Sequence, residues 1–92
     1  MSRRAERTVV ICNKRGLHAR AAARFVKLAE SFAAEVTVSR RDQSVSGRSI
    51  MGLMMLAAVP GASIEIAAAG DDAPAAVAAL ARLVERRFDE DE

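Results

Sequence analysis

Hydrophobic and polar positions recur along this chain with two different periods. β-Branched residues that alternate with polar ones are typical of half-buried strands, whereas apolar residues three and four positions apart are typical of amphipathic helices. The two patterns succeed one another in the order β-α-β-β-α-β-α. They predict strands at 6–11, 35–39, 43–46 and 63–67, and helices at about 19–31, 49–58 and 73–87.

Turn-forming and capping residues separate these elements. Gly47 ends the third strand, and Pro60 with Gly61 predicts a turn before the fourth. Ser49 can cap the second helix, and Pro74 suits the first turn of the third. Helices on one face of a mostly antiparallel sheet form a two-layer α+β domain. We therefore expect an α+β open-faced sandwich, with three helices on one face of a four-stranded, mostly antiparallel sheet.

Length and composition indicate one small domain, residues 1–92. Hydrophobic residues make up 51% of the chain but aromatic residues only 3%, so the core must be built from small aliphatic side chains. The single cysteine, Cys12, excludes an internal disulfide and fits a cytoplasmic location. No apolar run approaches the roughly 20 residues that span a membrane, so no membrane insertion is expected.

Charge is distributed unevenly around a formal net value of +2. Basic residues crowd the first third of the chain, where they could attract nucleic acid or an acidic protein surface. Nucleic-acid-binding α/β domains usually stack bases on aromatic side chains, and this chain has no Trp or Tyr and only three Phe. We therefore expect no nucleic-acid partner. The acidic end, residues 89–92, is expected to be frayed and solvated.

The only histidine, His18, lies where a loop becomes the first predicted helix. A helix N-terminus presents unpaired N–H groups and a partial positive charge, which suit a phosphate. A neutral imidazole beside such a site can be a nucleophile that takes up a phosphoryl group. Arg20 supplies a permanent charge, and the small Ala19 leaves room for a phosphoryl donor. Without this context, a lone histidine is most often a surface or capping residue.

Other chemistries fit the sequence poorly. One His and one Cys do not provide the three or four ligands that a metal site needs, so no metal is expected. A Ser-His-Asp hydrolase would need a nucleophile elbow and a substrate cleft, and the chain offers no such motif. No cofactor is expected either.

The second predicted helix is apolar on every side, which leaves two interpretations open. Helices of this kind are normally buried all round. Alternatively, its methionines form an adaptable surface for binding partners. Ser49, at its start, needs no function beyond capping.

Three segments resemble one known family. The stretch from Gly16 to Val26, with Gly-Leu-His-Ala-Arg at its start, resembles the active-site signature of HPr, the histidine phosphocarrier of the bacterial phosphotransferase system. Residues 48–56 resemble the family's regulatory-serine segment, and 60–66 with Gly70 resemble its last strand and turn. The resemblance runs from about Thr8 to Phe88. Ala21 stands where the family usually has proline, which can mark a branch such as the nitrogen-related NPr.

The resemblance implies a role for each matched position. His18 would accept a phosphoryl group on its Nδ1 from phosphorylated enzyme I and pass it to an enzyme IIA domain, with Arg20 balancing the phosphate charge. In some lineages the serine at position 49 is phosphorylated by a dedicated kinase, HPr kinase/phosphorylase. The expected partner-docking surface consists of Ala19, Arg24, Ile50, Met51, Met54, Met55 and Ala58.

One alternative to a carrier stays open. Some HPr-like domains bind a kinase or transcription factor and act by occupancy alone, although this chain keeps the histidine that a carrier needs. Two pathways are compatible with the sequence, sugar uptake and nitrogen regulation.

Overall fold

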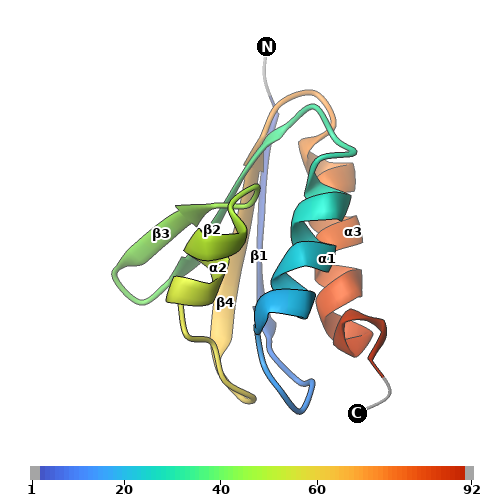
Figure 1. Cartoon of the computed structure of the whole chain (residues 1–92). Helices are drawn as coiled ribbons and strands as arrows, with labels where there is room; N and C mark the ends of the chain where they lie inside the picture. Colours follow the sequence, from blue (N-terminus) through green and yellow to red (C-terminus); the bar gives the residue numbers. More distant parts are fainter. Residues whose placement is uncertain (1–2, 91–92) are drawn as a thin grey trace.

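The computed structural model describes residues 3–90 and confirms the α+β open-faced sandwich (Figure 1). Each element lies close to its predicted position. The strands are β1 (Arg4–Val10), β2 (Glu35–Arg40), β3 (Gln43–Ser46) and β4 (Ser63–Ala69); the helices are α1 (Ala19–Ala29), α2 (Ile50–Met55) and α3 (Ala73–Glu85), followed by a 3₁₀ turn, η1 (Arg87–Asp89).

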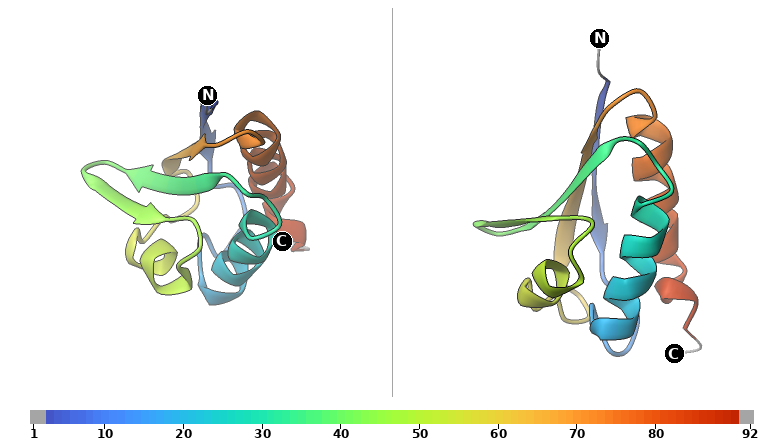
Figure 2. Two further views of the ribbon diagram at one scale, coloured as in Figure 1. Left: turned by 90° about the horizontal axis from the view of Figure 1, so that it is seen from above. Right: turned by 45° about the horizontal axis from the view of Figure 1, so that its top comes forward.

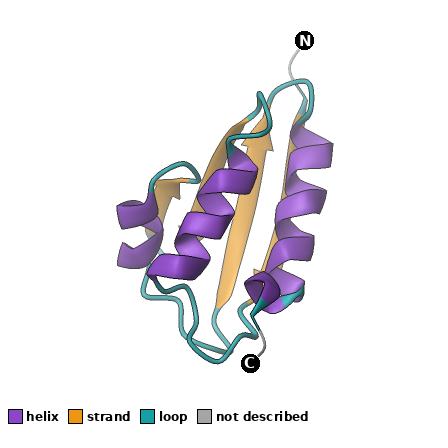
Figure 3. Ribbon diagram, turned by 45° about the vertical axis from the view of Figure 1, so that its right-hand side comes forward, coloured by secondary structure: helices purple, strands orange, loops and turns teal. Residues whose placement is uncertain are grey.

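The four strands form one sheet in the order β1-β4-β2-β3, and every neighbouring pair is antiparallel. The first and last strands of the chain, β1 and β4, are therefore neighbours in the sheet, where Val9 pairs with Ile64. All three helices lie in front of the same face of the sheet (Figure 3), and the view from above separates the two layers (Figure 2). Within residues 3–90, no helix covers the opposite face of the sheet (Figure 3).

The core lies between the sheet and the helices. Alternate strand residues such as Val36, Val38 and Ile66 point into it, as the period-two pattern predicts. Phe25 of α1 and Leu80 of α3 pack against them and are fully buried. Many of the remaining core residues are alanines, which allow the helices to approach the sheet closely.

The third helix ends two residues before the end that its apolar pattern predicts, residue 87. Helix α3 ends at Glu85. The next turn contains three consecutive non-glycine residues with positive φ angles, which are 59° for Arg87, 54° for Phe88 and 61° for Asp89. Left-handed backbone is unfavourable for such residues and persists only where packing compensates it. Here the turn carries Phe88 back into the core, where it is fully buried.

The prediction of a frayed acidic end is therefore wrong for Asp89 and Glu90, although Asp89 is solvated as predicted. Asp89 accepts a hydrogen bond from Nε of Arg86 at 2.9 Å, and Glu90 lies against the loop before α1. The burial of Phe88 is the physical reason, because it anchors the chain just before both carboxylates. Asp91 and Glu92 lie outside the described residues.

Candidate functional site

His18 is the N-cap residue of α1. Its backbone is extended, with φ −82° and ψ 179°, and its Nδ1 accepts a hydrogen bond from the N–H of Arg20 at 3.3 Å. The imidazole therefore takes the place that Ser, Thr or Asp usually fills at a helix start. Its side chain is 23% exposed. This places Nδ1 at the partial positive end of the helix while the ring stays within reach of a partner.

The loop before His18 is held by close backbone contacts. Gly16 has a φ of +69°, and a Cβ at this position would lie 2.5 Å from the carbonyl oxygen of Ala58. The same carbonyl accepts a hydrogen bond from the N–H of Leu17 at 3.0 Å. Only glycine satisfies both demands, positive φ and close approach. The glycine of the motif thus fixes the direction from which the chain enters α1.

A carboxylate occupies the other side of the imidazole. Nε2 of His18 lies 2.5 Å from Oε2 of Glu90, whose side chain is only 11% exposed. Oε1 of the same carboxylate accepts a hydrogen bond from the side-chain amide of Asn13 at 2.9 Å, and this amide also donates to the carbonyl of Gly16 at 2.8 Å. Asn13 is the one polar residue among the fully buried side chains of the described chain. The two contacts of Glu90, with His18 and with Asn13, join residues 72 and 77 positions apart, so no local sequence signal could have found them.

Hydrogen bonds keep Glu90 in its ionised form. Burial raises the pKa of its carboxyl, but the hydrogen bonds from Asn13 and His18 and the electrostatic attraction of His18 and Arg24 outweigh it. The pKa of Glu90 therefore lies below its ordinary value. An ionised carboxylate accepts hydrogen bonds and donates none, so it calls for an N–H on the facing imidazole nitrogen.

The two arginines of α1 have different surroundings. Arg20 is exposed, and its guanidinium forms no hydrogen bond or ion pair among residues 3–90, which agrees with a charge available to a phosphate. Arg24 is half-buried, and its guanidinium donates to the carbonyl of Phe88. The structure thus gives Arg24 a contact within the chain that the sequence did not predict. Ala19, between the histidine and Arg20, is exposed.

Helix α2 presents an apolar surface to solvent. Met51 and Met55 are 71% and 67% exposed, and Ile50 and Met54 are exposed as well, whereas within the helix only Leu53 is buried. The interpretation of α2 as a thoroughly buried helix is therefore wrong. We call Ile50, Met51, Met54 and Met55 the α2 patch.

Ala58 does not belong to this patch. It is only 3% exposed, so its predicted place on the docking surface is wrong. Helix α2 ends at Met55, and Ala57 has a φ of 51°, which turns the chain inward before Ala58. Val59, which the sequence reasoning missed, is exposed instead and lies against Gly16. Its only sequence signal is an apolar side chain in a turn.

Ser49 caps α2 as the sequence predicted. Its Oγ accepts a hydrogen bond from the N–H of Gly52 at 2.9 Å. The serine is half-buried beside the exposed Ile50. A modification of this hydroxyl would therefore place charge at the edge of the α2 patch.

The comparison with known families decides what this arrangement is. Residues 5–86 match the family model described as the PTS HPr component phosphorylation site. The chain belongs to the HPr family. The relatives that match it are named as phosphocarrier proteins, and His18, Arg20 and Ser49 all lie within the region matched by the family model. The resemblance seen in the sequence is thereby confirmed.

Individual HPr and NPr proteins match over nearly their whole length. The phosphocarrier protein NPr of Shewanella violacea is 46% identical over 85 residues, which cover 92% of this chain and 93% of that protein. The phosphocarrier protein HPr of Neisseria meningitidis serogroup A is 46% identical over 87 residues, covering 95% and 98%. A crystal structure of HPr from Thermoanaerobacter tengcongensis superposes with a TM-score of 0.90 at 41% identity, covering 96% and 99% of the two chains. Similarity of equal strength to an HPr and an NPr leaves the branch open.

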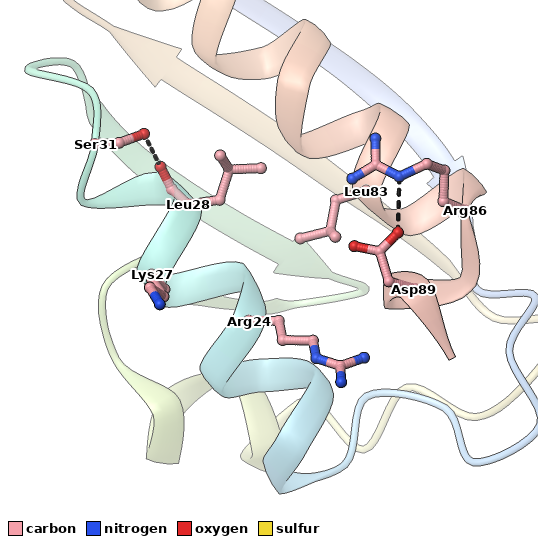
Figure 4. Close-up of a pocket in the computed structure, with 7 residues that line it drawn as sticks. All are labelled: Arg24, Lys27, Leu28, Ser31, Leu83, Arg86 and Asp89. Atoms are coloured by element: carbon pink, nitrogen blue, oxygen red, sulfur yellow. Dashed lines mark hydrogen bonds and ion pairs between the residues drawn. The ribbon is translucent and has the colours of Figure 1, made fainter. Parts of the chain in front are cut away.

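One groove of this HPr-family chain does not include His18 in its lining. The groove, about 430 Å³ in volume, runs between α1 and α3 (Figure 4). Its lining residues are Arg24, Lys27, Leu28, Ser31, Leu83, Arg86 and Asp89. The imidazole of His18, with 23% of its side chain exposed, is instead reached from the surface.

Two further features bear on the site. Within residues 3–90, no three His, Cys, Asp or Glu side chains come together in a way that could hold a metal ion. In the same range, no helix has the length and apolar character needed to cross a membrane.

Proposed function

We propose that this chain accepts a phosphoryl group on Nδ1 of His18 from phosphorylated enzyme I and passes it to an enzyme IIA protein. The observation that carries the proposal is the position of Nδ1, which faces the N–H of Arg20 at the N-terminus of α1 on a partly exposed ring. A phosphoryl group bound there would meet unpaired helix N–H groups. The membership of the chain in the HPr family supports the phosphocarrier role.

The transfer exchanges one P–N bond for another. The lone pair of Nδ1 attacks phosphorus while the bond to the donor histidine breaks, and the reverse exchange hands the group to the acceptor. Charge on the phosphoryl oxygens must be balanced throughout, because the protein contributes mainly positioning and electrostatics to such reactions. The exposed Arg20 lies two residues from His18 and supplies that charge.

The α2 patch, together with Ala19, is the proposed docking surface. Its exposed methionines can adapt to the different surfaces of a donor and an acceptor. Helices α1 and α2 pack side by side, so the patch lies next to the helix that carries His18 (Figure 3). Arg24, on the side of α1 that faces α3, adds positive charge to the helix that carries His18 and favours an acidic partner surface.

Ser49 is the proposed site of regulatory phosphorylation by an HPr kinase. Its half-buried hydroxyl caps α2, and a phosphate there would be met by the N-terminal N–H groups of the helix. We expect such a modification to leave the fold intact and to impede docking on the adjacent patch.

The test is phosphorylation by enzyme I and phosphoenolpyruvate. The wild-type chain should acquire phosphate that is labile in acid and stable in alkali, as expected of a phosphoramidate. The variant His18→Ala should acquire none, and circular dichroism should confirm that it is folded. Acid-labile phosphate on His18→Ala would overturn the assignment. A variant that lacks phosphate yet still regulates a bound kinase or transcription factor would favour the alternative of an occupancy-based regulator.

A further inference from the structure

We propose that Glu90 is a positioning residue for phosphoryl transfer at His18. Its carboxylate holds the ring proton on Nε2, leaves the lone pair of Nδ1 available, and balances the positive charge that the ring acquires. This inference rests on the proposed function, because it concerns the same histidine. It assigns a task to a segment that the sequence indicated only as an acidic end.

The two ring nitrogens meet opposite partners. Nε2 faces a carboxylate oxygen at 2.5 Å, and Nδ1 faces a backbone N–H at 3.3 Å. A carboxylate requires an N–H opposite it, and an N–H requires a lone pair. The reversed tautomer would set a lone pair against the carboxylate and two N–H groups against each other. The geometry therefore specifies the Nε2–H tautomer from both sides of the ring.

This tautomer is the one that the reaction needs. When Nδ1 attacks phosphorus, its lone pair forms the new P–N bond and the electron pair of the broken bond returns to the donor nitrogen. Nε2 keeps its proton, so the ring carries a positive charge until the phosphoryl group leaves and the lone pair returns to Nδ1. A carboxylate against Nε2 stabilises that charge at the moment when it develops. Glu90 remains clear of Nδ1 and so does not compete with the incoming group.

The carboxylate is built into the fold. Asn13, fully buried, donates one amide hydrogen to Glu90 and the other to Gly16, and so joins the carboxylate to the loop before α1. The buried Phe88 anchors the turn that leads to Glu90, and Arg24 donates to its carbonyl. Holding a side chain in one geometry through surrounding contacts is how proteins position reactive groups. The left-handed backbone at residues 87–89 is the conformational cost of this arrangement.

Two substitutions separate the tasks of the carboxylate. Glu90→Gln keeps the size and one acceptor oxygen but removes the charge, whereas Glu90→Ala removes both. Glu85→Gln is the matched control, because Glu85 is an exposed glutamate at the end of α3 without a contact to His18. Each variant is measured by ¹⁵N NMR of the imidazole nitrogens, by the rate of phosphorylation from enzyme I, and by the rate from phosphoramidate, a small donor without a docking surface.

We expect Glu90→Ala to lower both phosphorylation rates about tenfold, the worth of one charge-assisted hydrogen bond. The ¹⁵N spectrum should show loss of the dominant Nε2–H form. Glu90→Gln should fall between Glu90→Ala and wild type, and Glu85→Gln should match wild type in every measurement. Thermal unfolding of the variants should remain cooperative.

Unchanged tautomer populations in Glu90→Ala would overturn the proposal, whatever the rates do. So would rates that fall with enzyme I but not with phosphoramidate, since that result would make Glu90 a docking residue. If the wild-type chain takes up no phosphate from enzyme I, the proposed function fails. The ¹⁵N spectrum and the phosphoramidate rates then still decide whether Glu90 positions His18.

Discussion

At the scale of single residues, this site depends on a few side chains with unusual surroundings. Gly16 is required by its positive φ and by the nearby carbonyl of Ala58. His18 replaces the usual small polar N-cap and thereby places the proposed nucleophile at a helix terminus. Asn13 is polar yet fully buried, and both of its donor hydrogens are used. Residues of this kind mark function more clearly than the aliphatic core does.

Arg20→Ala should slow phosphoryl transfer far more than it lowers stability. Its guanidinium is exposed and has no partner within the described chain, so the melting temperature should fall by no more than a few degrees. Charge-assisted contacts are worth roughly 1.5–3 kcal/mol, which corresponds to a rate loss of about tenfold to a hundredfold. Rapid-quench kinetics with enzyme I would measure this. Arg82→Ala, an exposed arginine on α3, is the control; equal rates for both variants would remove Arg20 from the site.

At the scale of elements, the second helix shows how a short apolar helix can be both packed and exposed. Within α2 only Leu53 enters the core, while the four residues of the α2 patch face solvent. Ser49 caps the helix, and Gly52 is tightly placed: a Cβ there would lie 3.0 Å from the serine Oγ. The helix therefore combines a defined start with an adaptable surface.

Met51→Glu should weaken binding to enzyme I without unfolding the domain. Met51 is 71% exposed, so a charge there meets solvent in the free protein but must be desolvated in a complex. Titration calorimetry should show weaker binding, with thermal unfolding close to wild type. Leu53→Ala provides the contrast, because truncation of a buried leucine costs about 2–5 kcal/mol. Loss of folding in Met51→Glu would mean that this methionine belongs to the core.

Ser49→Asp should fold normally and accept phosphate on His18 more slowly. Aspartate is as good an N-cap as serine, so the hydrogen bond to Gly52 can be kept. Its negative charge at the edge of the α2 patch would repel an acidic partner. Enzyme I titrated against both proteins would measure the transfer rate. Ser49→Ala separates the effects, since it loses about 1 kcal/mol of capping but adds no charge; equal rates for Ser49→Asp and wild type would leave Ser49 as a cap alone.

At the scale of the whole molecule, long-range contacts fasten the ends of elements to one another. The loop before α1, the start of α1 and the turn η1 gather at one end of the sandwich (Figure 1). At the start of α3, Asp72 accepts hydrogen bonds from the N–H groups of Ala33 and Ala34 at 2.9 and 2.8 Å, and so ties this helix to the loop before β2.

Asp72 should make stability depend on pH in the acidic range. The hydrogen bond from the N–H of Ala33 lowers the pKa of Asp72, and partial burial raises it. The N–H of Ala34 and the charge of Arg48 lower it further, so the pKa lies below its ordinary value of 3.8. A carboxyl with a depressed pKa stabilises the fold above its unfolded-state value, and this stabilisation is lost as the pH falls through the folded-state value.

Urea unfolding of wild type and Asp72→Asn across pH 2–7 would test this. Wild type should be the more stable protein near neutral pH, and the difference should shrink as the pH falls below about 4. Asp71→Asn, a change at the exposed neighbouring aspartate, is the control for charge alone. A difference that stays constant with pH would contradict the role assigned to the Asp72 carboxylate.

The sequence by itself determined the order and approximate positions of the elements, the fold, and His18 as the candidate phosphoryl acceptor. The signals that predicted them are local: strand alternation, helix periodicity, the Ser49 cap and the Gly16–Arg20 motif. Such signals can be read from the sequence because backbone preferences and the pattern of burial act over a few neighbouring residues. The exposure of the methionines of α2 depends on which side of this helix faces the sheet. Because the helix is apolar on every side, its sequence does not distinguish that side, and only the packed structure shows it.

Only the tertiary structure decided the surroundings of His18. Glu90 and the histidine are 72 residues apart, and their contact depends on three non-glycine residues in left-handed conformations that no local propensity favours. The burial of Phe88 compensates that backbone and brings the carboxylate to the ring. Ala58 likewise takes part in a contact between distant segments, since its carbonyl accepts a hydrogen bond from the N–H of Leu17. These contacts form because distant segments of the chain pack into the same core. Their free energy depends on both segments together, so a short stretch of sequence does not predict them.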